Sequence, residues 1–450
     1  MKEKAVQLRQ SGQRMAYLSI CVLKDGEELR PAHIEAFRNQ FMKRVSRKMV
    51  ETSELGTCAF CGRCGYVSAT VNEAFKFATF DKPGFCPSLR KQDATKVLPI
   101  CSECMTYLKN GANRIMKNLS LDFLNVKLWI IPSLLRRDDG LLEKVVKSIE
   151  STVGEYRDFA RNETRIVRAL SQIDEQVFYD FVFVSIKQSQ QRIELHLTQI
   201  SPTRLKLLVD ASKRVGERQT LNENELPTVE RMWHLYQKPA RRTLAGKNYF
   251  ALVRSVFHGE NYSYQRFLWH CMDTLRKTVF SGDEKNKLSA TRSLARQIFA
   301  CVLYLNSIDV FNFREVKGDV SENFAERFFE KFPEFFNHPW KKAVFLTGVL
   351  TGKLLSIQYA KRQATPFFNK LKGLKMNIRD VQALVPEIRN KLQQYGAFGN
   401  WAQELIRLIG HYYMLCGDCK VGIDELNFVF TLGMAYSNGE NFTVKEDENA

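Results

Sequence analysis

The sequence predicts an α+β N-terminal half with a metal-stapled insertion, followed by an all-α C-terminal half that ends in a helical bundle. Three observations predict this fold class. Two C-x2-C pairs lie about forty residues apart, apolar residues alternate in several segments before residue 200, and strand signals vanish from about Leu221 onward. The 450 residues exceed what one hydrophobic core supports, and we place an α+β domain at 1–220, a helical lobe at 221–335 and a basic helical bundle at 336–450.

Five cysteines carry the metal prediction. They occur as Cys58-Ala-Phe-Cys61-Gly-Arg-Cys64 and as Cys101-Ser-Glu-Cys104. A C-x2-C turn points two sulfur atoms to one side of a tight loop, and two such turns supply the tetrahedral sulfur set that Zn²⁺ prefers. We predict structural zinc at Cys58, Cys61, Cys101 and Cys104, with Cys64 as an alternative ligand because Cys61 and Cys64 have the same spacing. Such a site would hold the insertion at residues 65–100 in place; buried free thiols are the other interpretation.

Composition limits the partners and the compartment. The net charge is +18, from 67 basic and 49 acidic residues, so nucleic acid is the first partner to consider and an anionic membrane the second. No run approaches the roughly eighteen apolar residues of a membrane span. Eleven cysteines without an export signal favour reduced thiols in a cytoplasm.

The first 135 residues alternate between predicted strands and helices. A strand is expected at 16–23, and a helix follows with apolar residues four apart from Ile34. The other face of that helix is basic, which indicates either phosphate contact or a solvated surface; its basic residues are Lys43, Arg44, Arg47 and Lys48. Cys101 and Cys104 are expected at the start of a helix whose stripe includes Tyr107, Leu108 and Gly111. Residues 122–135 predict one strand that Pro132 closes.

Helices at 141–154 and 156–172 precede a predicted β-hairpin. Its strands are expected at 177–187 and 192–200, joined by the polar loop 188–191, which lacks the usual Gly or Asn. Ser201 then supplies a helix N-cap and Pro202 the first helical position, so a helix to about residue 215 follows.

The helical half contains three informative segments. Arg241, Arg242, Lys247 and Arg254 form a basic cluster. The phenylalanine-rich segment 321–340 predicts core residues rather than stacking platforms for bases. Gly348 and Gly352 lie four residues apart on an apolar helix, which allows a second helix to approach closely.

The segment from Lys341 to Asp380 has an unbalanced charge. It contains nine basic residues and Asp380 as its only acid. A solvated helix face normally alternates in sign, so this excess favours a track for phosphates over a solvated face. The nine residues are Lys341, Lys342, Lys353, Lys361, Arg362, Lys370, Lys372, Lys375 and Arg379.

No catalytic motif supports an enzyme. The sequence lacks a G-x-x-x-x-G-K-[ST] phosphate loop, a G-x-S-x-G motif and an H-E-x-x-H motif. Asp283-Glu284-Lys285 is similar to a fragment of a nuclease signature but has no partner residues nearby. We expect binding rather than bond cleavage, and no catalytic residue.

An ordered set of motifs resembles one family from about residue 55 onward. The set comprises Cys58-Ala-Phe-Cys61-Gly, Leu98-Pro99-Ile100-Cys101-Ser-Glu-Cys104, Trp129-Ile-Ile-Pro132, Gln199-Ile-Ser-Pro-Thr-Arg204-Leu205 and Phe345-Leu-Thr-Gly348. It resembles the large subunit of the type I-B CRISPR Cascade complex. The resemblance implies a non-catalytic subunit that helps to recognise the motif flanking a target, with a C-terminal bundle similar to the Cascade small subunit.

The same resemblance implies partners. They are the guide CRISPR RNA, target double-stranded DNA, the displaced strand of the R-loop, the other Cascade backbone subunits, and either helicase-nuclease or transposition proteins. Guide pairing would read the sequence while this chain contacts the flanking motif and the backbone. The role would be antiviral defence or RNA-guided transposition. The alternative function is a free-standing, zinc-stabilised nucleic-acid-binding regulator.

Overall fold

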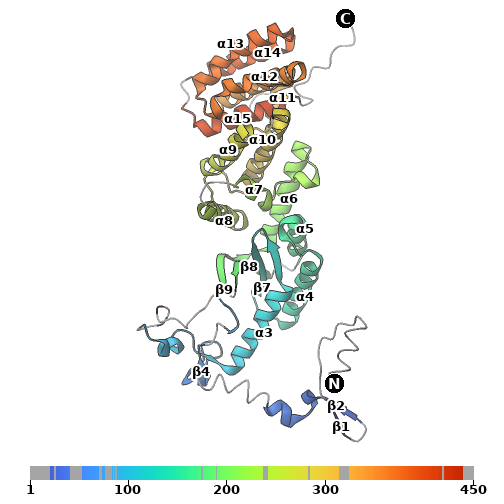
Figure 1. The fold of residues 1–450 in the computed structure, drawn as a ribbon, viewed down its shortest axis with the longest axis vertical. Helices are drawn as coiled ribbons and strands as arrows, with labels where there is room; N and C mark the ends of the chain where they lie inside the picture. The colour runs from blue at the N-terminus through green and yellow to red at the C-terminus, as the bar shows by residue number, and fades with distance from the viewer. Residues whose placement is uncertain are drawn as a thin grey trace, which may run out of the picture. The chain divides into compact units, whose positions relative to one another are not determined.

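A computed structural model describes most of the chain in two compact units. The described residues are 21–24, 27–40, 53–69, 73–76, 84, 86, 89–173, 176–188, 190–236, 242–281, 284–313, 324–417 and 420–438. Unit 1 comprises Met1–Lys117 with Ile186–Arg192, and unit 2 comprises Asn118–Ser185 with Ile193–Ala450 (Figure 1). The predicted division at residues 220 and 335 stays a prediction.

Unit 1 contains two small sheets and one long helix. Strands β1 (Val22–Lys24) and β2 (Glu27–Leu29) pair antiparallel, and the 3-10 helix η1 (Pro31–His33) follows. Residues 35–40 are helical, as expected from the apolar spacing there. Strands β3 (Glu54–Thr57), β4 (Cys64–Ser68) and β5 (Ile100–Cys101) form an antiparallel sheet in that order, with η5 (Lys91–Lys96) before β5.

Helix α3 (Ser102–Asn118) begins directly after β5, so the second cysteine pair does lie at a helix start. The predicted buried stripe of this helix is wrong in part, because Tyr107 is 67% exposed. Met105 and Ala112 are buried instead, and Leu108 packs with Met105 against Cys58 and Ile100. The cysteine cluster therefore determines which face of α3 is covered.

Unit 2 begins with a four-stranded sheet. Its strands β6 (Ser120–Phe123), β7 (Val126–Leu134), β8 (Val177–Lys187) and β9 (Gln190–Ile200) lie in that order. The single strand predicted at 122–135 is a hairpin, because Leu124 turns the chain with a φ of 54°. Strand β7 also continues past Pro132. The partner β6 pairs only with residues 126–129, so Pro132 has a neighbouring strand on one side alone, where a missing N–H is tolerated.

The β8–β9 turn is tighter than predicted. Strand β8 ends at Lys187 and β9 begins at Gln190, and Gln188 has a φ of 53°. Glutamine here takes the left-handed conformation that Gly or Asn usually supplies. Helix α8 (Arg242–His258) packs aromatic residues against this sheet: the Phe257 ring lies 5.3 Å from the Phe181 ring, and Phe250 lies 5.7 Å from Phe183.

Local capping sets the helices around the sheet. Asp138 accepts a hydrogen bond at the start of α4 (Asp139–Glu155), and Asp158 does so for α5 (Phe159–Ser171). Ser201 Oγ accepts from Arg204 N at 3.1 Å and begins α6 (Pro202–Gln219), as its sequence predicts. Helix α6 continues four residues past the expected end and stops at Thr220, which has a φ of 53°.

The described residues after 200 contain helices and no strand, which confirms the predicted α+β and all-α halves. They include η6 (Glu223–Glu225), α7 (Val229–Leu235), α9 (Tyr264–Ser281), α10 (Glu284–Ser307), α11 (Phe324–Glu330), α12 (Pro339–Arg362), η7 (Pro366–Leu374), α13 (Ile378–Gln394), α14 (Asn400–Cys416) and α15 (Ile423–Tyr436).

Helices α12 and α15 are in backbone contact, as the glycine spacing predicts. A Cβ placed on Gly348 would lie 2.0 Å from the Phe430 carbonyl oxygen, and one on Gly433 would lie 2.0 Å from the Phe345 oxygen. By length and composition, helix α12 is long and apolar enough to cross a membrane. The expectation that the chain has no such segment is therefore wrong. However, 72% of its apolar window is buried, as in the core helix of a bundle.

The phenylalanine-rich segment is core, as predicted. Its described members Phe328, Phe329, Phe332, Phe335 and Phe336 are each at most 3% exposed. The Phe328 ring stacks 5.0 Å from Phe345 of α12, so these residues join α11 to the bundle. Burial of this kind excludes them as stacking platforms for bases.

Candidate metal centre and nucleic-acid interface

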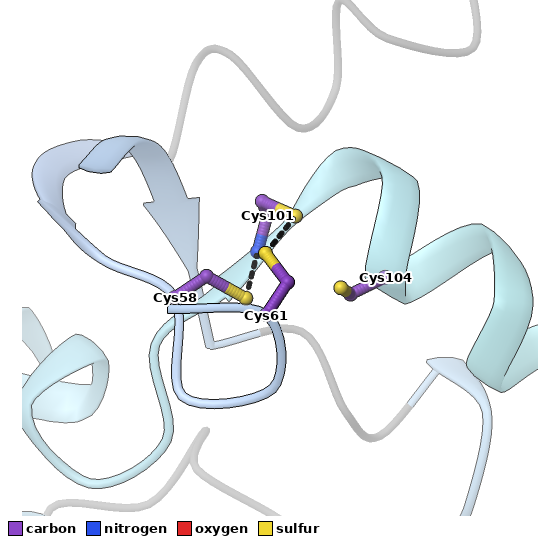
Figure 2. A group of neighbouring side chains, drawn as sticks. All are labelled: Cys58, Cys61, Cys101 and Cys104. Carbon is purple, nitrogen blue, oxygen red and sulfur yellow. Dashed lines mark hydrogen bonds between the residues drawn. The ribbon is translucent and has the colours of Figure 1, made fainter. Parts of the chain in front are cut away.

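Four cysteine sulfur atoms of unit 1 converge between β3, β5 and the start of α3. The Sγ atoms of Cys58, Cys61, Cys101 and Cys104 all lie within 4.8 Å of one another (Figure 2). Cys58 is buried and the other three are half-buried. Cys64, the alternative ligand, is exposed on β4, where its sulfur lies 3.5 Å from Thr57 Oγ1.

The first knuckle is shaped by its own backbone. Gly62 N donates to the Cys58 carbonyl at 2.9 Å, and Gly62 has a φ of 70° that residues with a Cβ rarely adopt. Ala59 N donates to the Pro99 carbonyl at 2.8 Å, which ties this turn to the segment before the second pair. Arg63 and Glu103 form an exposed ion pair at 2.8 Å, with one residue beside each knuckle.

The thiol environments differ. Burial acts to raise the pKa of the Cys58 thiol, but backbone N–H groups, with Cys101 first, outweigh it and lower that pKa to about 6. Cys101 N donates to Cys58 Sγ at 3.4 Å. Burial and the neighbouring sulfur atoms raise the pKa of Cys104 to about 12. Cys58 therefore favours the thiolate while Cys104 resists a further negative charge in the absence of a cation.

The donor set fits zinc. Sulfur atoms at the corners of a tetrahedron with Zn–S bonds of about 2.3 Å are about 3.8 Å apart. The Cys61 and Cys101 sulfur atoms are 3.8 Å apart. Bound Zn²⁺ would stabilise four thiolates together and close its coordination with protein sulfur alone, which is the composition of a structural site rather than a catalytic one.

The basic segment 341–380 is not one phosphate track. Lys341 is buried and pairs with Glu425 at 3.0 Å, Lys342 pairs with Glu326 at 3.3 Å, and exposed Lys370 pairs with Glu387 at 3.3 Å. Acidic residues distant in the sequence neutralise these lysines. The positive charge that this segment presents to a ligand is therefore smaller than its count of basic residues suggests.

The other predicted basic residues of this segment lie on the surface of unit 2. Lys361 and Arg362 both lie against the Tyr395 ring, and Lys353 lies against Trp401. Lys375 and Arg379 are exposed. Lys43, Arg44, Arg47, Lys48 and Arg241 lie outside the described residues, as do the side chains of Arg242 and Lys247.

A basic pocket with exposed aromatic residues lies between α9 and η7. Its volume is about 760 Å³, and its lining combines the predicted Lys372 and Lys375 with residues of α9. Trp269 and Phe280 are 49% and 48% exposed there. The complete lining is Trp269, Asp273, Arg276, Lys277, Phe280, Lys372, Gly373 and Lys375. Exposed rings among lysines can stack bases while the cations contact phosphates.

Trp269, Lys277 and Phe280 of this pocket are not among the binding residues predicted from the sequence. They lie about one hundred residues before Lys372. Their positions along α9 were a signal in the sequence, because Trp269 and Phe280 lie off the face on which this helix buries its other large apolar residues. The pairing of these rings with Lys375 depends on the tertiary fold.

The η7 end of this pocket is strained. Lys372, Gly373 and Leu374 have φ values of 46°, 67° and 55°, and two of them carry a Cβ. Non-glycine residues in this region cost about 1–3 kcal/mol each and persist where surrounding contacts hold them. Arg276 supplies such contacts, since its Nε and Nη2 donate to the Leu374 carbonyl at 3.1 and 2.9 Å. Arg276 Nη2 also bonds Asp424 at 2.6 Å, which fixes its guanidinium.

The fold and the two sites define a class: an α+β protein with a four-cysteine staple, joined to a helical bundle with a basic, aromatic-lined pocket. Residues 55–200 match the family model of the CRISPR-associated protein TM1802 central domain, and residues 227–448 match that of its C-terminal domain. The chain is therefore a CRISPR-associated protein of this family. No curated protein matches the chain.

Proposed function

We propose that the chain is the non-catalytic large subunit of a type I-B CRISPR Cascade complex. It would help to recognise the motif flanking the target and to stabilise the R-loop of guide RNA and target DNA, including the displaced strand. The family matches over both domains support a CRISPR role. The compartment is then the prokaryotic cytoplasm, and the complex serves antiviral defence or RNA-guided transposition.

The observation that carries the displaced-strand role is the α9–η7 pocket. Trp269 and Phe280 expose about half of their surface beside Lys375. Lys277 and Lys372 also line the pocket, in exposed ion pairs with Asp273 and Asp380 that a phosphate would have to replace. A strand without its complement presents both base faces and phosphates, and this combination of rings and cations accommodates both. A duplex hides its bases, so exposed rings have less to bind there.

The zinc staple has a supporting role in this proposal. Bound through Cys58, Cys61, Cys101 and Cys104, Zn²⁺ would join the β3–β4 turn to the start of α3 and fix the intervening insertion. Structural zinc in small modules contributes about 10–16 kcal/mol of apparent binding free energy. A rigid insertion can then contact the guide, the flanking motif or a neighbouring backbone subunit.

Reconstitution tests the proposal. The chain is co-expressed with its operon neighbours and a guide RNA, and target binding is measured with the chain present and omitted. We expect the chain to co-purify with the guide RNA and target binding to require it. Target binding of equal affinity without the chain contradicts the proposal. Incubation of the complex with Mg²⁺ and target DNA, without a helicase-nuclease, should leave the DNA intact.

The alternative function is a free-standing, zinc-stabilised nucleic-acid-binding regulator, which the four-cysteine cluster and the charge of +18 also suit. It requires that the isolated chain bind duplex DNA or RNA tightly and that it not co-purify with a guide RNA. The reconstitution therefore separates the two functions.

A further inference from the structure

A second pocket of unit 2 contains a half-buried arginine, Arg292, that has no role in the proposed function. Its volume is about 960 Å³, which is within the range of small-molecule sites. It is lined by α6, α10, α11, α12 and α15, with Arg218, Arg292, Arg296 and Lys331 as its basic residues and Glu225 as its acidic one. We call it the Arg292 pocket.

Arg292 is held rigidly by neutral groups. Its Nε donates to the Met434 carbonyl at 3.1 Å, and its Nη2 lies 2.8 Å from Ser356 Oγ and from Ser437 Oγ and 3.0 Å from the Gly352 carbonyl. Among the described residues, no carboxylate forms an ion pair with Arg292, and its Nη1 makes no hydrogen bond. Arg292 is half-buried, and a cation partly removed from water is costly unless an anion accompanies it.

Arg296 lies one turn further along α10 and increases the cost. It donates to the Ala435 carbonyl at 3.1 Å and lies 5.0 Å from the centre of the Tyr436 ring, again without a carboxylate among the described residues. Burial, together with the charge of Arg296, lowers the pKa of Arg292 to about 10. Two guanidinium groups that repel each other would be stabilised by one anion between them.

A polar side chain without a partner completes the lining. The side-chain nitrogen and oxygen of Gln219 are both buried and form no hydrogen bond with the described residues. Buried amide groups are normally bonded, and an unpaired one costs about 1–3 kcal/mol. Gln219 therefore offers a donor and an acceptor to a ligand that enters the pocket.

Aromatic walls indicate what the anion is attached to. Tyr359 and Tyr436, both half-buried, line the pocket beside the cations, whereas Phe328 and Phe332 are each 2% exposed and leave no free ring face. Arg218 pairs with Glu334 at 2.8 Å and lies 5.1 Å from the Phe332 ring, so it is partly neutralised already. Arginine binds phosphate oxygens in bidentate geometry, and aromatic rings bind a planar base.

We propose that the Arg292 pocket binds a nucleotide, with the phosphate held by Arg292, Arg296 and Lys331 and the base against Tyr359 and Tyr436. The source is either a free nucleotide or one unit of a single strand. The pocket is separate from the α9–η7 pocket, with which it shares no lining residue. This inference does not depend on the Cascade role, because the isolated full-length chain tests it.

Calorimetric titration with deoxyadenosine monophosphate is the test. We expect binding by the full-length chain, no binding of adenosine, and a loss of about tenfold in affinity for Arg296→Gln and for Lys331→Gln, since each removes one charge-assisted contact. Both residues are exposed, so the fold should be retained, which circular dichroism checks. Arg407→Gln removes an exposed arginine of α14 outside the pocket and should leave affinity unchanged.

A second titration, with hexadeoxyadenylate, shows whether the ligand is a free nucleotide or one unit of a single strand. If the hexamer binds more tightly than the mononucleotide and loses the same factor in Arg296→Gln, the ligand is a single strand; if it binds more weakly, the ligand is a free nucleotide. The proposal is overturned if neither probe binds at millimolar concentration, or if both variants bind as the wild type does. A chain that fails to join the guide-RNA complex but binds the mononucleotide refutes the proposed function and leaves this inference standing.

Discussion

Asn427 of α15 and Met376, just after η7, exchange two hydrogen bonds in the core of the bundle. Met376 N donates to Asn427 Oδ1 at 3.2 Å, and Asn427 Nδ2 donates to the Met376 carbonyl at 2.9 Å. Asn427 is 0% exposed. This pairing fixes the end of the strained segment that presents Lys372 and Lys375 to the α9–η7 pocket.

Asn427→Leu should therefore both destabilise the bundle and weaken single-strand binding. It leaves the N–H and C=O of Met376 buried without partners, which costs roughly 2–4 kcal/mol. Urea unfolding measures the stability, and anisotropy of a labelled oligothymidylate measures the binding. Asn390→Leu, an exposed position on α13, is the matched control and should change neither. Equal stability of the two variants would show that the pairing contributes little.

Trp269→Ala should weaken binding of a single-stranded oligothymidylate by about 1–3 kcal/mol, because it removes a stacking surface. The Trp269 side chain is half exposed, so the fold should not depend on it. Tyr107→Ala removes another exposed ring, from α3 in unit 1, and should leave this affinity unaltered. If the two variants lose affinity equally, the α9–η7 pocket is not the stacking site.

Cys58→Ser should abolish zinc binding, since it removes the most buried of the four sulfur ligands. Metal analysis of the purified chain is expected to show about one zinc ion per wild-type chain. Cys64→Ser is the matched control, because Cys64 lies outside the cluster, and it should keep its zinc. Zinc retained in Cys58→Ser and lost in Cys64→Ser would assign the ligand to Cys64.

Gly348→Ala should destabilise the bundle by about 3 kcal/mol, because its Cβ would lie 2.0 Å from the Phe430 carbonyl oxygen and force α12 and α15 apart. Gly410→Ala is the control, and its effect on stability should have the opposite sign. That glycine is exposed within α14 with nothing within 4 Å of the added Cβ, so alanine should stabilise by about 0.5–1 kcal/mol. Thermal unfolding distinguishes them, and two shifts of the same sign would contradict the close approach.

Glu163 should make stability depend on pH. Its carboxylate oxygens accept from Val229 N at 3.0 Å and from Glu230 N at 3.2 Å at the start of α7. Burial raises its pKa from 4.5 to about 7 despite these bonds. Between those values the folded state holds a proton that the unfolded state has released, so stability falls as pH rises through this window.

Glu163→Gln removes this titration. We expect wild-type stability to fall by roughly 1–3 kcal/mol more than that of the variant between pH 4.5 and pH 7.5. Glu217→Gln, an exposed position on α6, should retain the wild-type slope. Urea unfolding at several pH values gives the slopes. Parallel curves for the wild type and Glu163→Gln would show that Glu163 does not titrate there.

Local signals in the sequence were sufficient for the elements that depend on near neighbours. The capping of α6 by Ser201 and Pro202, the helix start at the second cysteine pair and the burial of the phenylalanine segment were all predictable. The turns at 124 and 188 were predicted wrongly, because each needs an unusual backbone conformation. Leu124 and Gln188 adopt positive φ without being Gly or Asn, so no turn signal marked them.

Three features could be predicted without the structure: the paired cysteines, the order of an α+β half and an all-α half, and the close contact that Gly348 allows. Each follows from spacing over a few residues, which the backbone geometry of turns, strands and helices fixes directly. Which charged side chains remain available to a ligand depends instead on the packing of distant helices. Burial of the core brings Glu425 to Lys341, leaves Arg292 without a carboxylate among the described residues, and places Trp269 beside Lys375, because contacts between distant residues depend on how whole helices pack.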